Sequence, residues 1–194
     1  MTIYDLKPKF QNILRPLVKS IWKLGITPNQ ITASTCLLSV AVGLWLLCSK
    51  NEMFFILPVF FFIRMALNAI DGMLAKEHNL KSPIGAILNE VTDVVSDGFL
   101  YYAFSRFDFI NTHLLMFVIF FSAISEITGL AVLLNGSTRQ YAGPMGKSDR
   151  AFVFSVLAIL ISCHLTSAFV YNGILTLIAL LLVKTILNRA KKGM

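Results

Sequence analysis

Six long apolar runs, separated by short polar connections, are the feature that most limits how this chain can fold. The runs are approximately Ile31–Ser49, Met53–Ala75, Pro83–Ser105, Thr112–Leu134, Ala151–Leu165 and Tyr171–Asn188. A stretch of roughly 20 apolar residues allows a helix to cross the hydrocarbon core of a bilayer. With 56% hydrophobic and 14% charged residues, the chain lacks the polar surface that a soluble domain of this length requires. The pattern therefore predicts an all-α membrane protein with six transmembrane helices.

Residues 1–25 have a different pattern, in which apolar residues recur at helical spacing and basic residues lie between them. The apolar set is Ile3, Leu6, Phe10, Ile13, Leu14, Leu17, Val18 and Ile21, and the basic set is Lys7, Lys9, Arg15, Lys19 and Lys23. This pattern predicts an amphipathic helix in the membrane interface, which Pro8 and Pro16 bend or divide. Residues 26–194 would then form the six-helix transmembrane domain, with Asn29 capping its first helix.

The basic residues give the expected orientation. If the N-terminus is cytoplasmic, that side of the membrane carries Lys7, Lys9, Arg15, Lys19, Lys23, Lys76, Lys81, Arg139, Lys147, Arg150, Arg189, Lys191 and Lys192. The opposite side carries only Lys50 and Arg106. This asymmetry predicts that both termini are cytoplasmic. Although the net charge is +7, there is no continuous basic stripe with interleaved aromatic residues, so we expect no nucleic-acid partner.

Polar side chains inside the predicted spans are informative, because a charge at the centre of a membrane helix costs about 2.5–3.5 kcal/mol on insertion scales. They are Arg64, Asn68 and Asp71 in the second run, Asn89, Glu90, Asp93 and Asp97 in the third, and Glu126 in the fourth. In the third run, Asn89, Asp93 and Asp97 are spaced by four and so share one helix face. A short turn joins the two runs, so we expect the two helices to lie side by side and antiparallel.

Two interpretations of these polar residues remain open from their positions alone. Oxygen ligands that converge from two helices suit a hard divalent cation, Mg²⁺ or Mn²⁺. Alternatively, the acids form a proton or ion path, or structural ion pairs with Arg64, and Glu126 is a candidate for such a pair. A transporter built from inverted repeats finds no support, since the chain shows no internal repeat.

The spacing of the polar residues resembles a known signature. The chain reads Asn68-Ala-Ile-Asp71-Gly72-Met-Leu-Ala75-Lys76, eight residues, Gly85, three residues, Asn89, three residues, Asp93. This is similar to the pattern D-x-x-D-G-x-x-A-R-x8-G-x3-D-x3-D of the CDP-alcohol phosphotransferases, also called CDP-alcohol phosphatidyltransferases. The six spans, the amphipathic N-terminal helix and the segment from Ile26 to Thr32 also look like that family. Asn68, Asn89 and Lys76 depart from the pattern, and the chain looks like a bacterial branch with Asn at two aspartate positions.

The resemblance implies an enzyme of phospholipid synthesis in the bacterial inner membrane, with residues 26–194 as its catalytic domain. Such an enzyme moves a phosphatidyl group from CDP-diacylglycerol to a small polar alcohol, releases CMP, and is commonly a homodimer. The implied ligands of Mg²⁺ or Mn²⁺ are Asn68, Asp71, Asn89 and Asp93, with Glu90 and Asp97 as nearby acids that compensate for the two asparagines. Asp93 is the implied general base, and the implied nucleotide-binding residues are Gly72, Ala75, Lys76 and Gly85.

The connection before the fifth run carries the candidate acceptor site. Arg139, Lys147 and Arg150 lie in this glycine-containing segment, where they would converge on an acceptor phosphate. The segment is similar to that of family members that use phosphorylated polyols, such as inositol phosphate, and glycerol 3-phosphate is a second candidate. The alternative for the three cations is anchoring on the cytoplasmic side. The loss of two motif aspartates also leaves the alternative of a non-catalytic CDP-lipid-binding membrane protein derived from such an enzyme.

Overall fold

The computed structural model describes residues 3–192, with side chains from Phe10 onward. The predictions for residues 1–2 and 193–194, and for side chains before Phe10, lie outside the described part. The α-helices are α1 (Ile3–Lys23), α2 (Pro28–Leu47), α3 (Ile56–Glu77), α4 (Pro83–Tyr102), α5 (Thr112–Ala131), α6 (Lys147–Ser162) and α7 (Ala168–Lys192). The 3₁₀ helices are η1 (Asn51–Phe55), η2 (Ala103–Arg106) and η3 (Val132–Asn135). Residues 3–192 contain no strand, which confirms the all-α class.

Four of the described helical stretches are long and apolar enough to cross a membrane. They are Pro28–Leu47, Asn51–Glu77, Thr112–Asn135 and Ala168–Lys192. The α4 helix carries three acids in its middle, and α6 has only 16 residues. Composition and length therefore separate α4 and α6 from the other predicted spans, and the count of six spans stays a prediction.

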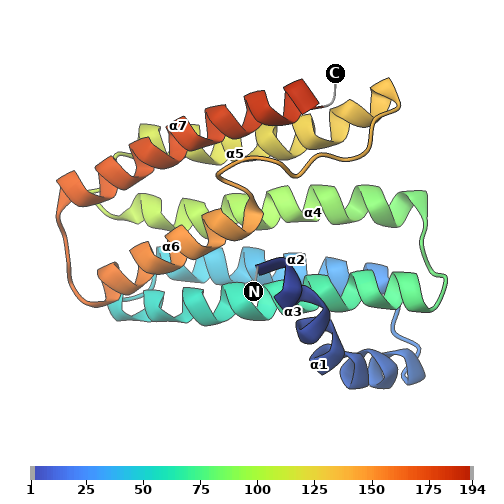
Figure 1. The fold of residues 1–194 in the computed structure, drawn as a ribbon. Helices are drawn as coiled ribbons and strands as arrows, with labels where there is room; N and C mark the ends of the chain where they lie inside the picture. Colours follow the sequence, from blue (N-terminus) through green and yellow to red (C-terminus); the bar gives the residue numbers. More distant parts are fainter. Residues whose placement is uncertain (1–2, 193–194) are drawn as a thin grey trace.

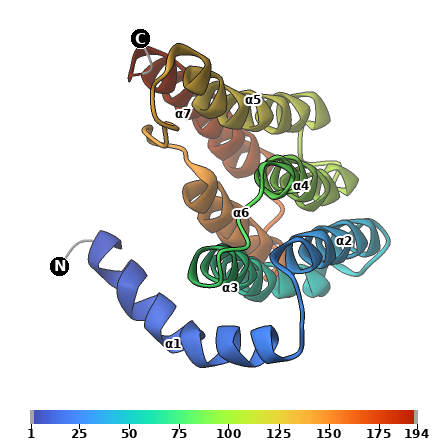
Figure 2. The ribbon, with the colours of Figure 1, turned by 90° about the vertical axis from the view of Figure 1, so that its right-hand side faces the viewer.

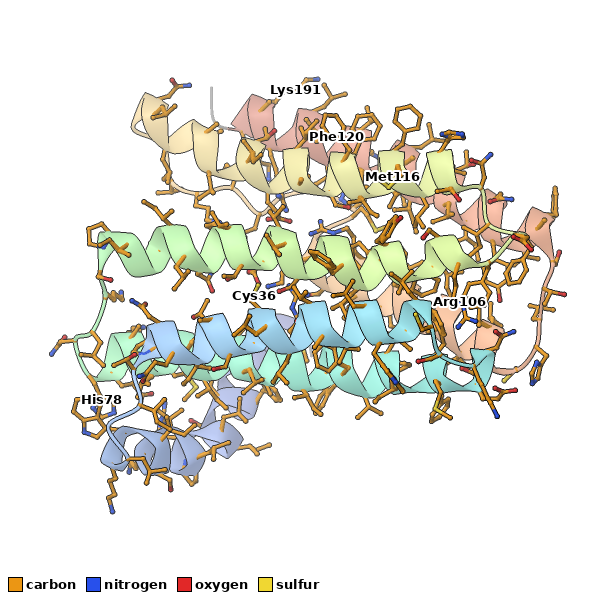
Figure 3. All side chains as sticks on the ribbon, turned by 180° about the vertical axis from the view of Figure 1, so that it is seen from behind. Cys36, His78, Arg106, Met116, Phe120 and Lys191 are labelled. Atoms are coloured by element: carbon orange, nitrogen blue, oxygen red, sulfur yellow. The ribbon has the colours of Figure 1, made fainter. Side chains whose placement is uncertain are left out.

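Helices α2 to α7 form one elongated bundle (Figure 1). The α4 helix packs mainly against α2 and α5, α3 packs against α1, α2 and α6, and α5 packs against α7. Gly43 permits the close approach of α2 to α4, because a Cβ atom there would lie 2.6 Å from the carbonyl oxygen of Phe99. The α1–α2 and α3–α4 connections share one end of the bundle. His78 marks this end and Arg106 marks the opposite end in Figure 3.

Local hydrogen bonds explain where the helices begin. Thr27 caps α2, since its Oγ1 accepts from the backbone of Gln30 at 3.3 Å and the Gln30 side chain accepts from the backbone of Thr27 at 2.8 Å. Ser82 caps α4 by accepting from the backbone N–H of Gly85 at 3.0 Å. The prediction that Asn29 caps α2 is wrong, because the reciprocal Thr27–Gln30 pair starts the helix two residues earlier.

The α1 helix is bent but not divided, and it crosses beside α3 at the end of the bundle marked by His78 (Figure 2). Val18 is buried, and the Trp22 ring stacks on His78 with ring centroids 4.1 Å apart. Ile13 and Leu17 remain exposed. An amphipathic helix with an unburied apolar edge is suited to a membrane interface, and that location stays a prediction.

The connection from α5 to α6 turns back into the bundle, so that α6 begins about halfway along α4 (Figure 1). The backbone N–H of Met145 donates to Oγ1 of Thr185 on α7 at 3.0 Å. Gly143 has φ +142°, and a Cβ atom there would lie 2.7 Å from Cβ of Thr185. The close contact with α7 and the backbone angle both require glycine. This path places the first turn of α6 inside the bundle rather than at its end.

Apolar and polar side chains are separated within the bundle. A large core includes Tyr101, Phe104 and Phe154, and a smaller one beneath α1 includes Ile70 and Leu74. The outer surface also exposes large apolar side chains, among them Met116 and Phe120 on α5 (Figure 3). An apolar exterior around an interior that also holds buried charged side chains, such as Arg64 and Asp97, is expected of a bundle in lipid.

Candidate active site

A cavity of about 370 Å³ opens between α2, α3, α4 and the first residue of α6. Its lining includes Asn68, Asp71, Gly72, Ala75, Gly85, Asn89, Asp93 and Lys147. We call it the large cavity. It lies towards the end of the bundle that holds the α3–α4 connection, since Lys81 and Ser82 also line it. Lys76, which the resemblance implied as nucleotide-binding, is exposed and outside this lining.

The α3 and α4 helices face each other across the large cavity instead of packing closely side by side. The short connection does make them neighbours, but α2 packs against both of them. Arg64 of α3 spans the gap by donating to the carboxylate of Asp97 at 2.5 Å and to the backbone oxygen of Asp93 at 3.1 Å. The polar faces of α3 and α4 are therefore connected by the Arg64 side chain, and the large cavity lies between the two helices.

Three donors gather on one oxygen of Asp93. Its Oδ1 accepts from Nδ2 of Asn68 at 3.1 Å and from Nη2 of Arg64 at 3.3 Å, and it forms an ion pair with Lys147. Within residues 10–192, no hydrogen bond is recorded to Oδ2. Three donors thus hold one carboxylate oxygen of Asp93 in place.

Asp71 is buried and is held by a residue that the sequence analysis did not single out. Its Oδ2 accepts from Oγ1 of Thr32 at 2.8 Å, and the same hydroxyl contacts the backbone oxygen of Pro28 at 3.0 Å. Asn29 also lines the large cavity. Both residues belong to the segment from Ile26 to Thr32 that resembles the family, which was the available signal. The pairing of Thr32 with a residue 39 positions away was not visible in the sequence.

Asp97 lies between two arginines. Its Oδ1 is 2.5 Å from Nη1 of Arg64 and its Oδ2 is 3.0 Å from Nη2 of Arg150. All three side chains are buried. Because both oxygens already hold a cation, Asp97 is placed to organise α3, α4 and α6.

Glu126 on α5 gathers three further cations. Its carboxylate lies 3.0 Å from Arg150, 3.2 Å from Arg189 and 3.8 Å from Arg139. The interpretation that pairs Glu126 with Arg64 is wrong. Arg64 instead pairs with Asp93 and Asp97 of α4. Glu126 pairs with Arg150 of α6 and Arg189 of α7. These ion pairs connect α5 to α6 and α7.

The cations predicted to bind an acceptor phosphate have different surroundings. Lys147 lines the large cavity and contacts Asp93. Arg150 is only 1% exposed and is bound between Asp97 and Glu126. Arg139 forms a two-nitrogen ion pair with Glu90, and its guanidinium lies 4.7 Å from the ring centroid of Tyr141. Of these three cations, Lys147 lines the large cavity, whereas Arg139 and Arg150 are paired with carboxylates.

The donor atoms around the large cavity fit a hard divalent cation. Asn68, Asp71, Asn89 and Asp93 line it together and offer carboxylate and amide oxygens. Among the described residues, no three His, Cys, Asp or Glu side chains come together to hold a metal ion. The four residues Asn68, Asp71, Asn89 and Asp93 form the candidate ligand set. Glu90 and Asp97 are engaged by arginines and stand outside this set.

A second, smaller pocket of about 40 Å³ lies between α4, α5 and α6. We call it the small pocket. Its lining includes Tyr101, Ser122, Glu126 and Arg150. Asp93 and Lys147 line both the small pocket and the large cavity. Asp93 therefore stands at the boundary between two neighbouring spaces.

Comparison with known proteins gives consistent results. A family model described as CDP-alcohol phosphatidyltransferase matches residues 25–186. The chain is 41% identical over 193 residues to the inner membrane protein YnbA of Escherichia coli (strain K12), covering 98% of this chain and 96% of that protein.

Two solved structures have the same fold. The phosphatidylinositol phosphate synthase PgsA1 of Mycobacterium tuberculosis with CDP-DAG bound matches with a TM-score of 0.76 and 18% identity, covering 94% of each chain. The same synthase in complex with manganese and citrate matches with a TM-score of 0.74 and 18% identity, covering 92% of this chain and 87% of that one.

Proposed function

This chain belongs to the CDP-alcohol phosphatidyltransferase family, and from that premise we propose that it moves the phosphatidyl group of CDP-diacylglycerol onto a small polar alcohol, releasing CMP. It is a transferase of phospholipid synthesis and a multi-pass inner-membrane protein. The observation that carries the proposal is the position of Asp93. This carboxylate borders both the large cavity and the small pocket. The two spaces give separate places for the nucleotide lipid and for the alcohol.

The large cavity would hold the cytidine diphosphate group. Gly72 faces open space, with no atom within 4 Å of a Cβ atom built there, so a diphosphate has room to approach the backbone. Gly85 lies where a Cβ atom would come within 2.7 Å of Oδ1 of Asn29. Asn68, Asp71, Asn89 and Asp93 would hold Mg²⁺ or Mn²⁺, which when bound neutralises diphosphate charge. The likeness to a synthase structure that contains manganese supports this assignment.

The transfer itself is a displacement at phosphorus. The hydroxyl oxygen of the alcohol forms a bond to the phosphatidyl phosphorus, and the bond from that phosphorus to the bridging oxygen of CMP breaks. CMP leaves with the electron pair of that bond. Asp93 accepts the proton of the attacking hydroxyl, and Arg64 and Asn68 hold the carboxylate in position.

The membrane arrangement follows from the same premise. In the proposed arrangement α2 to α7 all span the bilayer, with the polar faces of α4 and α6 turned to the interior. Both termini and the α3–α4 connection lie on the cytoplasmic side, where the large cavity receives the nucleotide. The α1 helix rests in the interface on that side. By analogy with the family, the protein assembles as a homodimer.

The test is CMP release by the purified protein from CDP-diacylglycerol with Mg²⁺ or Mn²⁺. The acceptor panel is glycerol, glycerol 3-phosphate, inositol, inositol phosphate and serine. Metal-dependent release with one acceptor, lost in Asp93→Asn, supports the proposal and names the product. Binding of CDP-diacylglycerol without release for any acceptor would instead support the non-catalytic lipid-binding protein.

A further inference from the structure

We propose that Thr32 is a positioning residue, whose hydroxyl group holds the carboxylate of Asp71 in place for the divalent cation. This inference rests on the proposed function, in which Asp71 is one of four ligands on α3 and α4, and it adds to that site a residue of α2. Three observations support it: the hydrogen bond between the two side chains, the charge around Asp71, and the packing of α2 against α3.

The hydrogen bond between Thr32 and Asp71 joins α2 to α3. Oγ1 of Thr32 lies 2.8 Å from Oδ2 of Asp71 and 3.0 Å from the backbone oxygen of Pro28. A hydroxyl group has one proton to donate, and hydrogen bonds to a carboxylate are stronger than those to a peptide carbonyl. Because threonine has few rotamers in a helix, the position of this hydroxyl is also restricted. The hydroxyl of Thr32 therefore donates to Asp71.

Asp71 differs from the other acids around the two cavities, because the structure places no cation beside it. The other acids each form an ion pair with lysine or arginine, and they are Glu90, Asp93, Asp97 and Glu126. Among the side chains of residues 10–192, no ion pair to Asp71 is recorded, although Asp71 is only 6% exposed. Buried carboxylates are normally paired with a cation or coordinate a metal. Since Asp71 lines the large cavity, a divalent cation there would supply the missing positive charge.

Apolar packing fixes α2 and α3 at the point where this hydrogen bond forms. Ile31 and Ile70 directly precede Thr32 and Asp71, and both are buried in the smaller core beneath α1. Thr32 is itself only 7% exposed and lines the large cavity together with Asp71. A hydrogen bond between two helices held in this way limits the rotation of the carboxylate. Partners of this kind orient the ligands of a metal, and their loss typically lowers metal affinity about 10- to 100-fold.

The experiment measures the affinity of the purified full-length protein for Mn²⁺, by electron paramagnetic resonance of the free ion. Thr32→Val removes the hydroxyl group and nearly keeps the volume of the side chain, so we expect the dissociation constant to rise about tenfold or more. Thr35→Val is the matched control and should leave the dissociation constant unchanged. Thr35 is also buried on α2, and its hydroxyl donates to the backbone oxygen of Ile31 at 2.8 Å, but among the described residues it has no recorded hydrogen bond to a carboxylate.

A second pair of variants isolates the hydroxyl group and serves if Thr32→Val does not fold. Thr32→Ser and Thr32→Ala both lose the methyl group, and only the serine keeps a hydroxyl. The Mn²⁺ affinity should stay within about threefold of the unchanged protein in Thr32→Ser and fall about tenfold or more in Thr32→Ala. In the transfer assay, the Mn²⁺ concentration that gives half-maximal CMP release should rise in Thr32→Ala. The kcat at saturating Mn²⁺ should change by less than about threefold, because Thr32 acts through the metal ligand and does not touch the reacting atoms.

The outcomes separate this inference from the proposed function. Equal Mn²⁺ affinities for Thr32→Ser and Thr32→Ala, or for Thr32→Val and Thr35→Val, would overturn the positioning role while leaving the transferase in place. Absence of Mn²⁺ binding by the unchanged protein would overturn it as well. Absence of CMP release with every acceptor would instead remove the proposed function. In that case the Mn²⁺ affinities of the same variants still test the role of Thr32, since they are measured without turnover.

Discussion

Nη2 of Arg150 lies 3.0 Å from Oδ2 of Asp97, and both side chains are almost completely buried. Arg150 belongs to the first turn of α6 and Asp97 to the C-terminal half of α4. The pair therefore ties the point at which α6 begins inside the bundle to the helix that carries Asp93. Charges buried in this way remain tolerable only while each has its partner.

Removal of Arg150 should destabilise the protein strongly. Arg150→Met leaves Asp97 and Glu126 with one cation fewer each, and breaking a buried ion pair typically costs about 3–5 kcal/mol. Thermal unfolding in detergent should show a clear decrease in midpoint. Lys184→Met, at an exposed position on α7, is the control and should leave the midpoint nearly unchanged. Equal midpoints for the two variants would mean that the buried pair contributes little.

Asp93→Asn should abolish transfer while leaving the fold intact. The amide keeps the shape of the carboxylate but cannot accept the proton of the alcohol, and loss of a general base costs about 10²–10⁴-fold in rate. The measurement is kcat for CMP release at saturating metal and acceptor. Asp108→Asn, at an exposed acid between α4 and α5, should behave as the unchanged protein does. If Asp93→Asn kept most of the activity, a group other than Asp93 would accept the proton.

Restoring carboxylates at positions 68 and 89 should tighten metal binding. In the double variant Asn68→Asp, Asn89→Asp, two neutral amides become anions, so we expect Mn²⁺ affinity to rise about tenfold or more. Electron paramagnetic resonance of free Mn²⁺ measures this affinity without reference to turnover. Without metal the variant should also unfold at a lower temperature, because Asn68→Asp replaces a hydrogen bond to Asp93 with charge repulsion. Asn135→Asp, at the exposed last residue of η3, is the matched control, and equal Mn²⁺ affinities for the two variants would place the metal elsewhere.

Gly72→Ala should impair donor binding without affecting stability. A methyl group at Gly72 meets no atom within 4 Å in the protein itself, so the unfolding midpoint should not fall. The methyl group would occupy part of the large cavity, and we expect the KM for CDP-diacylglycerol to rise about tenfold through loss of close contact with the diphosphate. Gly173→Ala adds a methyl group into open space on α7 and should leave the KM unchanged. An unchanged KM in both variants would indicate that the diphosphate does not bind against α3.

The sequence predicted the helices and most of the large cavity, because both depend on local patterns. Apolar runs and capping residues determine where the helices begin and end, and spacing by four places Asn89 and Asp93 on one face of α4. The motif positions on α3 line the same cavity for the same reason. Lys76 is the exception, since it is exposed and does not line this cavity.

The partners of the buried arginines were not predictable from such patterns. Glu126 is paired with Arg150 and Arg189, which are separated from it by 24 and 63 positions along the chain. These pairs form because the α5–α6 connection re-enters the bundle, and its path depends on the contact of Gly143 with Thr185. Pairing between distant helices is a property of the packed fold, and a single sequence does not display it.

The shared position of Asp93 between the large cavity and the small pocket has a kinetic consequence. In the proposed reaction both substrates would be present at once, one on each side of the carboxylate, and the phosphatidyl group would pass directly from donor to acceptor without a covalent enzyme intermediate. Initial rates measured over a grid of both substrate concentrations should then give intersecting double-reciprocal lines. Parallel lines, the mark of a ping-pong sequence, would indicate that the protein itself carries the phosphatidyl group between two half-reactions.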